Sequence, residues 1–240
     1  MDIFILLLII LYLPLNIATR QSPINITTNE CHFEKHIGVE TQYKDMINGK
    51  ITLDGRFLLT EYNGGKLKFK NYSRISDWKS LQFHFHSPSE HTIDGKYFDA
   101  EMHMVFQGQT YKDELAVVGL LFEVDENVEK DLFIESLKIN KLTKPEDKHE
   151  GINTSPAKIF KKIQNFENFH YQGSLTTPGY DEIVQWFIFK EAIKIPPCQY
   201  KMLNDLWNDQ TIEGCVKGNA RDLKSVGSRV IHCIHHDFKG

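Results

Sequence analysis

The feature that most constrains this chain is the run 81–86, in which apolar and polar side chains alternate without interruption. Successive side chains on a β-strand point to opposite faces, so this run predicts a strand with two unlike faces. Leu81, Phe83 and Phe85 share one face and are expected to lie in a core. The other face begins with Gln82 and continues with two histidines.

The two histidines are the strongest sign of chemistry in the sequence. His84 and His86 lie about 6.6–7 Å apart along a strand, so one nitrogen of each can reach the same ion at about 2.0 Å. A second alternating run, 100–106, follows a turn expected at 94–95, and its polar face carries His103. If the two runs pair, three imidazoles converge, and three His with one open position are typical of a catalytic zinc site.

The neighbours of the three histidines fit the same interpretation. Gln82 and Glu101 lie two residues from a histidine on the same faces, where they can accept imidazole N–H hydrogen bonds. Met102, Met104 and Phe106 take the opposite face of the second run and are expected in the core. A solvated sheet face with exposed histidines is the alternative, but a third His beyond a turn favours a metal site.

The rest of the chain predicts strands with few helices. The stretches 115–124 and 183–189 are apolar, β-branched and aromatic, as in central strands. Helical periodicity is limited to 127–139, 157–166 and 200–207, where the first segment places Val128, Leu132 and Ser136 on one face. No repeat or Pro/Gly-rich linker divides the 240 residues. We therefore expect a single α+β domain, mainly β, with one large antiparallel sheet and peripheral helices.

The charge balance argues against one class of partner. The chain has 28 Lys+Arg against 32 Asp+Glu, a net charge of −4, with no long block of either sign. Binding to phosphate backbones needs a basic surface, so nucleic acid is excluded as the expected partner. No obligate protein partner is indicated either.

The N-terminus predicts the compartment. Residues 3–13 form an apolar run that spans about 16 Å as a helix, short of a bilayer core of roughly 30 Å. This length suits a secretory signal peptide over 1–18 with cleavage near Ala18, which leaves a domain over 21–240. The preceding residues lack Lys or Arg, so a buried element or an uncleaved membrane anchor stays open. The protein is expected to be secreted or extracellular, or anchored through this segment.

Cysteines and glycosylation sequons agree with secretion. Four cysteines allow two disulfides in three pairings; they are Cys31, Cys198, Cys215 and Cys233. Three N-x-Ser/Thr sequons predict a glycoprotein; they begin at Asn25, Asn71 and Asn153.

Several segments match the motifs of one family. They are QSPINI at 21–26, the run at 81–106, LAVVG at 115–119, YQGSLTTP at 171–178, VQW at 184–186 and, more loosely, 219–221 and 227–230. Through them the chain resembles the alpha-class carbonic anhydrases from Gln21 to about Ile231. The resemblance implies that family's fold, a single domain around a twisted, mostly antiparallel mixed sheet of about ten strands.

The resemblance also implies residue roles. Zinc ligands would be His84, His86 and His103, with Gln82 and Glu101 as their hydrogen-bonding partners. Thr176 corresponds to the threonine that orients zinc-bound hydroxide, Glu90 to the acceptor of its hydroxyl proton, and Tyr171 to a further member of that network. The carbon dioxide pocket would comprise Val105, Val117, Leu175, Thr176, Thr177, Val184 and Trp186.

The implied activity is that of a zinc lyase, a carbonic anhydrase. It is the reversible hydration of carbon dioxide to bicarbonate and a proton by attack of zinc-bound hydroxide, with sulfonamides as inhibitors. The alternative is a catalytically weak, carbonic anhydrase-like surface binding module. At the position where the family often has a proton-shuttle histidine, this chain has Arg56, so His32 or His36 is the candidate substitute.

Overall fold

The computed structural model describes residues 19–55, 57–163, 167–207 and 215–239. The predicted signal peptide, 1–18, lies outside these residues. None of the helices in the described ranges is long and apolar enough to cross a membrane.

The described chain is mostly β-strand. The strands are β1 (Asn25–Ile26), β2 (His32–Tyr43), β3 (Met46–Leu53), β4 (Leu58–Glu61), β5 (Gly65–Asn71), β6 (Arg74–His86), β7 (Thr92–Ile93), β8 (Lys96–Tyr97), β9 (Ala100–Gly108), β10 (Leu115–Val124), β11 (Lys148–Thr154), β12 (Glu167–Gly173), β13 (Val184–Phe189), β14 (Ile193–Ile195), β15 (Cys215–Lys217), β16 (Ala220–Arg221) and β17 (His232–Lys239). The helices are α1 (Leu132–Ser136), α2 (Ala157–Phe160) and α3 (Pro197–Asn204), with 3-10 turns at Thr28–Glu30 and Ile139–Lys141.

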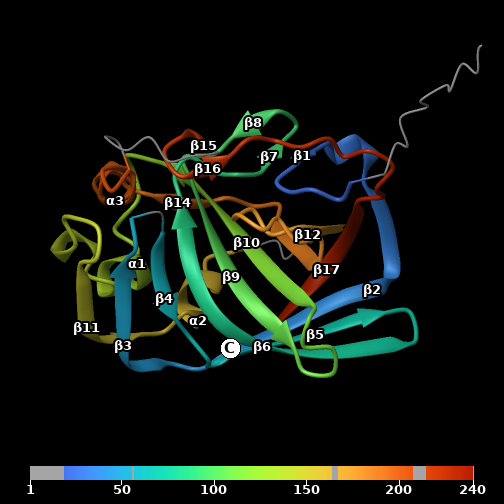
Figure 1. Ribbon diagram of the computed structural model, residues 1–240, viewed down its shortest axis with the longest axis horizontal. Coiled ribbons are helices and arrows are strands. Elements are labelled where there is room, and N and C mark those ends of the chain that lie inside the picture. Colours follow the sequence, from blue (N-terminus) through green and yellow to red (C-terminus); the bar gives the residue numbers. More distant parts are fainter. Residues whose placement is uncertain (1–18, 56, 164–166, 208–214, 240) are drawn as a thin grey trace, which may run out of the picture.

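One 12-stranded sheet organises the molecule (Figure 1). Its order is β11-β3-β4-β6-β5-β2-β17-β12-β13-β10-β14, and β9 lies between β6 and β10. Most neighbours are antiparallel, while β10–β13, β10–β14 and β2–β17 are parallel. The predicted mainly β fold around one large mixed sheet is confirmed. Two small sheets, β1-β7-β8 and β15-β16, lie along one edge, at the top of Figure 1.

The two alternating runs pair as the sequence predicts. β6 and β9 are antiparallel, and His84 lies directly opposite His103. The short β7–β8 hairpin between them turns at Asp94 and Gly95, both in the left-handed region with φ of 50° and 79°. The prediction for Leu81 is wrong: it is 43% exposed. A β-bulge between Ser80 and Gln82 shifts the register there, so Leu81 leaves the core face.

The faces of the sheet support two apolar clusters. The larger one holds Phe83 and Phe85 of β6 with Met102 and Met104 of β9, and the helical segments also pack into it. The smaller one includes Trp186 of β13 and lies on the histidine face. The three-histidine group is therefore built on a face whose reverse side is anchored in the main core.

The first helix is shorter than the sequence predicts, and α3 begins at Pro197 rather than at residue 200. In the segment 127–139 the helix begins only at Leu132, because the Asp131 side chain caps it by accepting from the backbone N of Phe133 and of Ile134. Leu132, expected on one helical face with Val128 and Ser136, is 69% exposed, since Phe133 and Ile134 take the buried positions.

A disulfide joins distant parts of the chain. Cys31, just before β2, is bonded to Cys233 on β17, 202 residues away. Cys198 on α3 is a free, exposed thiol. The expectation of a disulfide is thus confirmed, and its pairing closes nearly the whole domain.

Acid should destabilise the fold through a histidine on the sheet. His236 is buried, its Nε2 lies 2.7 Å from Thr41 Oγ1, and burial lowers its pKa to about 3. An unfolded histidine titrates near pH 6.5, so between these values the unfolded chain binds the extra proton. The contribution of neutral His236 to the free energy of unfolding is complete above pH 6.5. Below this pH it decreases by up to about 1.4 kcal/mol per pH unit.

Urea unfolding between pH 6.5 and pH 4.5 measures this slope. In His236→Gln the free energy of unfolding should depend less steeply on pH in this window. His235→Gln, which removes an exposed imidazole next to His236, serves as the control. Equal slopes for His236→Gln and the unmodified protein would contradict the assignment.

Candidate metal centre

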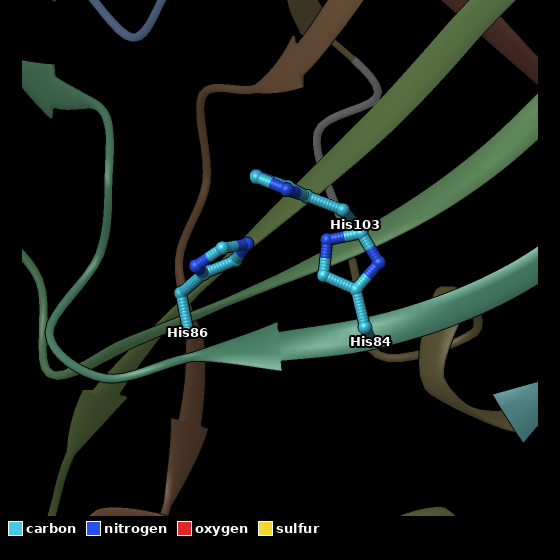
Figure 2. A group of neighbouring side chains, drawn as sticks. All are labelled: His84, His86 and His103. Atoms are coloured by element: carbon cyan, nitrogen blue, oxygen red, sulfur yellow. The ribbon is translucent and has the colours of Figure 1, made fainter. Parts of the chain in front are cut away.

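Three buried imidazoles meet on one face of the sheet. His84 and His86 rise from β6 and His103 from the neighbouring β9, as Figure 2 shows. One candidate ligand atom from each lies within 4.8 Å of the other two. The ring centroids are 5.0 Å apart for His84 and His86, 5.2 Å for His84 and His103, and 4.6 Å for His86 and His103. This is the convergence that the strand spacing predicts.

Each imidazole has one nitrogen occupied by an outer partner. Nδ1 of His84 lies 2.8 Å from Oε1 of Gln82, and Nε2 of His103 lies 2.8 Å from Oε1 of Glu101. Nδ1 of His86 lies 3.2 Å from the backbone oxygen of Asn219. Because these partner atoms are acceptors, the bonded nitrogens carry the protons. The predicted contacts of Gln82 and Glu101 are therefore present, and Asn219 is an additional partner.

The remaining nitrogens fit a metal ion. Nε2 of His86 is buried and has no hydrogen-bonding partner. Burial, followed by the neighbouring imidazoles, lowers the pKa of His84 well below its usual value, and burial likewise lowers the pKa of His86 and of His103. The imidazoles are thus neutral at physiological pH and their lone pairs are available. Three neutral nitrogen donors around one point match the preference of zinc.

Behind His103 lies a buried network that the sequence analysis missed. Oε1 of Glu101 accepts from His103 and from Nδ1 of His91, at 2.8 Å each, and Oε2 accepts from the backbone N of His91 at 2.9 Å. Burial alone would raise the pKa of Glu101, but the two imidazoles and their hydrogen bonds hold it well below its usual range. The carboxylate therefore stays charged and fixes the orientation of His103.

The network continues to Tyr171. Nε2 of His91 lies 2.6 Å from the Tyr171 hydroxyl, which donates to Oγ of Ser22 at 2.9 Å. The resemblance implies that Tyr171 belongs to the hydrogen-bond network of Thr176 and Glu90. In the structure its hydroxyl is linked through His91 to Glu101, the partner of His103. Tyr171 lies opposite Trp186 of β13.

Close packing at Gly119 supports this arrangement. Gly119 on β10 lies opposite His103 on β9. A Cβ added there would come within 2.6 Å of Ile188 Cδ1 and 3.0 Å of Glu101 Oε1. The missing side chain of Gly119 therefore leaves room for Glu101 and Ile188 to pack against β10.

A second carboxyl group, Glu90, lies close to the three histidines. Its Oε1 is 3.6 Å from Nδ1 of His86 and accepts from the backbone N of Arg221 at 2.9 Å. Burial raises the pKa of Glu90 to about 8, and the Thr176 side chain and the Arg221 backbone N–H act in the opposite direction, lowering this pKa. Oε2 of Glu90 is buried and has no hydrogen-bonding partner. The association of Glu90 with Thr176 stays a prediction, and the lowering effect of the Thr176 side chain on the pKa of Glu90 supports it.

The residues expected to hold the substrate form an apolar wall on the same face. Val105, Val117 and Trp186 lie in register across β9, β10 and β13, and all three are buried. Val184 belongs to the same cluster and Leu175 packs against it. The Trp186 ring is 4.8 Å from that of His103. Thr176 and Thr177 follow Leu175 and are partly exposed.

The expected proton-shuttle position is only partly visible. Arg56 lies outside the described residues, but the next residue, Phe57, packs against two of the three histidines, with ring centroids 5.2 Å from His84 and 5.5 Å from His86. His32 and His36, the suggested substitutes, lie on β2 beside β17 and β5, and the His36 ring stacks on Tyr72.

The comparisons with known proteins agree with this geometry. The family model of the eukaryotic-type carbonic anhydrases matches residues 13–235. Alpha carbonic anhydrase 7 of Arabidopsis thaliana is 28% identical over 217 residues, covering 88% of this chain and 73% of the relative. Carbonic anhydrase 4 of Rattus norvegicus is 34% identical over 181 residues, 67% of this chain and 57% of the relative.

Solved structures show the same relationship. Carbonic anhydrase Cah3 of Chlamydomonas reinhardtii, solved in complex with acetazolamide, superposes with a TM-score of 0.74 and 27% identity. The match covers 90% of this chain and 91% of Cah3. The extent of the family match, together with the fold and the three-histidine face, shows that the chain belongs to the eukaryotic-type carbonic anhydrase family.

Proposed function

We propose that this protein is a zinc carbonic anhydrase that catalyses the reversible hydration of carbon dioxide to bicarbonate and a proton. The observation that carries the proposal is the group of three neutral imidazoles, each with one free nitrogen facing a common point, with Nε2 of His86 buried and unpartnered. His84, His86 and His103 would hold the ion. Two features lie beside them: the Glu90 carboxyl, which would help to orient the attacking oxygen, and an apolar wall, which would hold carbon dioxide.

Zinc contributes Lewis acidity in such sites: it lowers the pKa of a water molecule to about 7 and so provides a hydroxide nucleophile at neutral pH, an effect for which carbonic anhydrases are the standard example. The three imidazoles would leave the full 2+ charge of the ion uncompensated, because burial keeps them neutral. Gln82, Glu101 and the Asn219 carbonyl would hold the rings in the orientation that binding requires.

Thr176 and Glu90 would orient the attacking oxygen. The Thr176 hydroxyl would donate to Glu90, because an ionised carboxylate can only accept a hydrogen bond. While Glu90 is ionised, the threonine proton points to it, and the threonine oxygen is left as an acceptor for the nucleophile. This would direct the lone pair of the nucleophile towards the substrate.

The apolar wall would hold carbon dioxide without strong contacts. Val105, Val117 and Trp186 present buried aliphatic and aromatic surface beside the imidazoles, and Val184 and Leu175 extend it. Carbon dioxide is small and has no net dipole, so such a surface binds it weakly and does not stabilise the ground state much. Bicarbonate is charged, and an apolar wall favours its release.

Sulfonamide binding is a further part of the proposal. Cah3, similar to this chain over nearly its whole length, was solved with acetazolamide. We expect aromatic sulfonamides to occupy the space between the three histidines and the apolar wall. Inhibition by such a compound would support the site assignment independently of turnover.

A stopped-flow assay of carbon dioxide hydration tests the proposal. The purified protein should accelerate hydration, lose this activity with a zinc chelator and regain it on addition of zinc. An inactive protein that contains zinc would instead favour the alternative, a carbonic anhydrase-like binding module. The presence of all three histidines, Thr176 and Glu90 favours the enzyme.

The rate is expected to depend on buffer. Proton release to solvent is best served by a group with a pKa near 7, and arginine stays charged at this pH. Arg56 occupies the position where such a group is expected, and Phe106 is buried in the main core on the opposite face. We expect the maximal rate to rise about tenfold from low to high millimolar imidazole-type buffer.

Arg56→His should make that rate nearly independent of buffer. The measurement is the maximal hydration rate of both proteins across the same buffer series. A wild-type rate that does not change with buffer would contradict the missing-shuttle hypothesis and indicate that another residue transfers the proton.

We further propose that the protein is secreted or extracellular, with a signal peptide over 1–18 and a catalytic domain over 21–240. The Cys31–Cys233 disulfide supports this, because such bonds persist in oxidising compartments. Expression in a secretory host should give protein in the medium that has lost about 18 residues and changes mass with glycosidase treatment if the sequons are used. Full-length protein retained in the cells would contradict the proposal.

A further inference from the structure

Arg221 and Tyr180 form a close cation–π pair beside the metal centre. Cζ of Arg221 lies 3.6 Å from the Tyr180 ring centroid, whereas the corresponding distance for Arg74 over Tyr111 is 4.8 Å. Nη1 of Arg221 also donates to the backbone oxygen of Ser22 at 2.6 Å. The guanidinium is partly buried, which strengthens its attraction to the aromatic face.

Tyr180 lies in the loop between β12 and β13, at the end of a turn that begins at Thr177. Its backbone N donates to the Thr177 oxygen at 2.9 Å, and its own backbone oxygen accepts from Nε2 of Gln21 at 3.0 Å. Its φ of 48° is in the left-handed region, which an aromatic residue adopts only where its surroundings hold it. The Arg221 guanidinium is one of these surroundings.

The backbone of Arg221 reaches the opposite side of the same site. Its N–H donates to Oε1 of Glu90 at 2.9 Å. Glu90 is also the carboxyl that the proposed function pairs with Thr176, and Thr176 and Tyr180 lie on the same loop between β12 and β13. One residue, Arg221, therefore contacts both Glu90 and Tyr180 of the loop that carries Thr176.

We infer that Arg221 and Tyr180 are positioning residues that fix the Thr176 hydroxyl relative to Glu90. Neither side chain is needed to touch the reacting atoms; both act through the loop. The inference rests on the proposed function, since it assigns Thr176 and Glu90 to the reaction. A small displacement of an orienting group lowers a rate strongly, so a contact outside the reacting centre has a kinetic effect.

Substitutions at Tyr180 test the pair. Tyr180→Leu keeps an apolar side chain of similar bulk but removes the aromatic face, whereas Tyr180→Phe keeps that face. We expect kcat/KM for hydration to fall about three- to tenfold in Tyr180→Leu, mostly in kcat, with zinc content unchanged, and to stay at the wild-type value in Tyr180→Phe. Tyr111→Leu removes the Arg74 partner on a remote turn and should leave kcat/KM unchanged.

A second measurement uses the metal-free protein and needs no activity. Hydrogen exchange of backbone amides in 174–181, followed by mass spectrometry after chelation, should be faster in Tyr180→Leu than in Tyr180→Phe or Tyr111→Leu. Unchanged exchange in Tyr180→Leu overturns the inference, and so does an equal loss of kcat in Tyr180→Phe. If the unmodified protein hydrates no carbon dioxide, the proposed function fails, and the exchange comparison still decides whether the pair holds the loop.

Discussion

Changing His86 to alanine is expected to remove zinc and carbon dioxide hydration together. Its Nε2 is buried without a partner, and its Nδ1 is held by the Asn219 backbone oxygen, so the ring is already oriented for an ion. Two imidazoles would remain, too few for a tight zinc site. We expect zinc affinity to fall by more than about a hundredfold, beyond the usual effect of removing an outer partner. Elemental analysis of the purified protein and stopped-flow hydration measure both losses.

His170→Gln is the matched control for this prediction. His170 is also buried, with Nδ1 3.0 Å from the Trp186 oxygen, and burial lowers its pKa to about 4. It lies outside the three-histidine group, so its replacement should reduce stability and leave the zinc content unchanged. The zinc assignment fails if His86→Ala retains zinc in a one-to-one ratio, or if the native protein is isolated without metal or with iron or manganese in the site.

The central part of the site was predictable because it depends on strand periodicity alone. His84 and His86 on one run and His103 on another needed only a two-residue period and one antiparallel pairing, both of which are local properties. Leu81 shows where this reasoning fails. The bulge between Ser80 and Gln82 depends on how β6 fits both β5 and β9, and no pattern within 81–86 indicates it.

His91 could not be found in this way. It lies in an irregular segment that follows the cis peptide bond between Ser87 and Pro88, where no periodicity assigns a face. Its partners, Glu101 and Tyr171, are 10 and 80 residues away. The one available signal was a histidine directly after Glu90, which is too weak to distinguish a buried network from an exposed side chain.

The pairing of the cysteines could not be predicted for the same reason, because it depends on long-range contacts. Four cysteines allow three sets of two pairs, and the pairing of Cys31 with Cys233 follows from the parallel contact of β2 with β17. That contact joins the first long strand to the last one, and no short-range pattern predicts it. Element types were therefore predictable, whereas contacts between distant strands required the folded chain.

Changing Thr176 to alanine should lower carbon dioxide hydration by about a hundredfold while zinc stays bound. The loss of one preorganised hydrogen-bonding group at a reacting centre typically has an effect of this size. Zinc content should not change, because the three imidazoles and their outer partners are intact.

Thr176→Ser separates the hydroxyl from the side-chain volume. Serine keeps the oxygen that acts on Glu90, so most of the hydration rate should return, and the affinity for an aromatic sulfonamide should recover with it. In Thr176→Ala that affinity should fall about tenfold or more, because a hydrogen bond involving a charged group is lost. Hydration by Thr176→Ala at the wild-type rate would show that the hydroxyl does not orient the nucleophile. A loss shared equally by Thr176→Ser would assign the effect to packing of the loop, since the methyl group is the part that serine lacks.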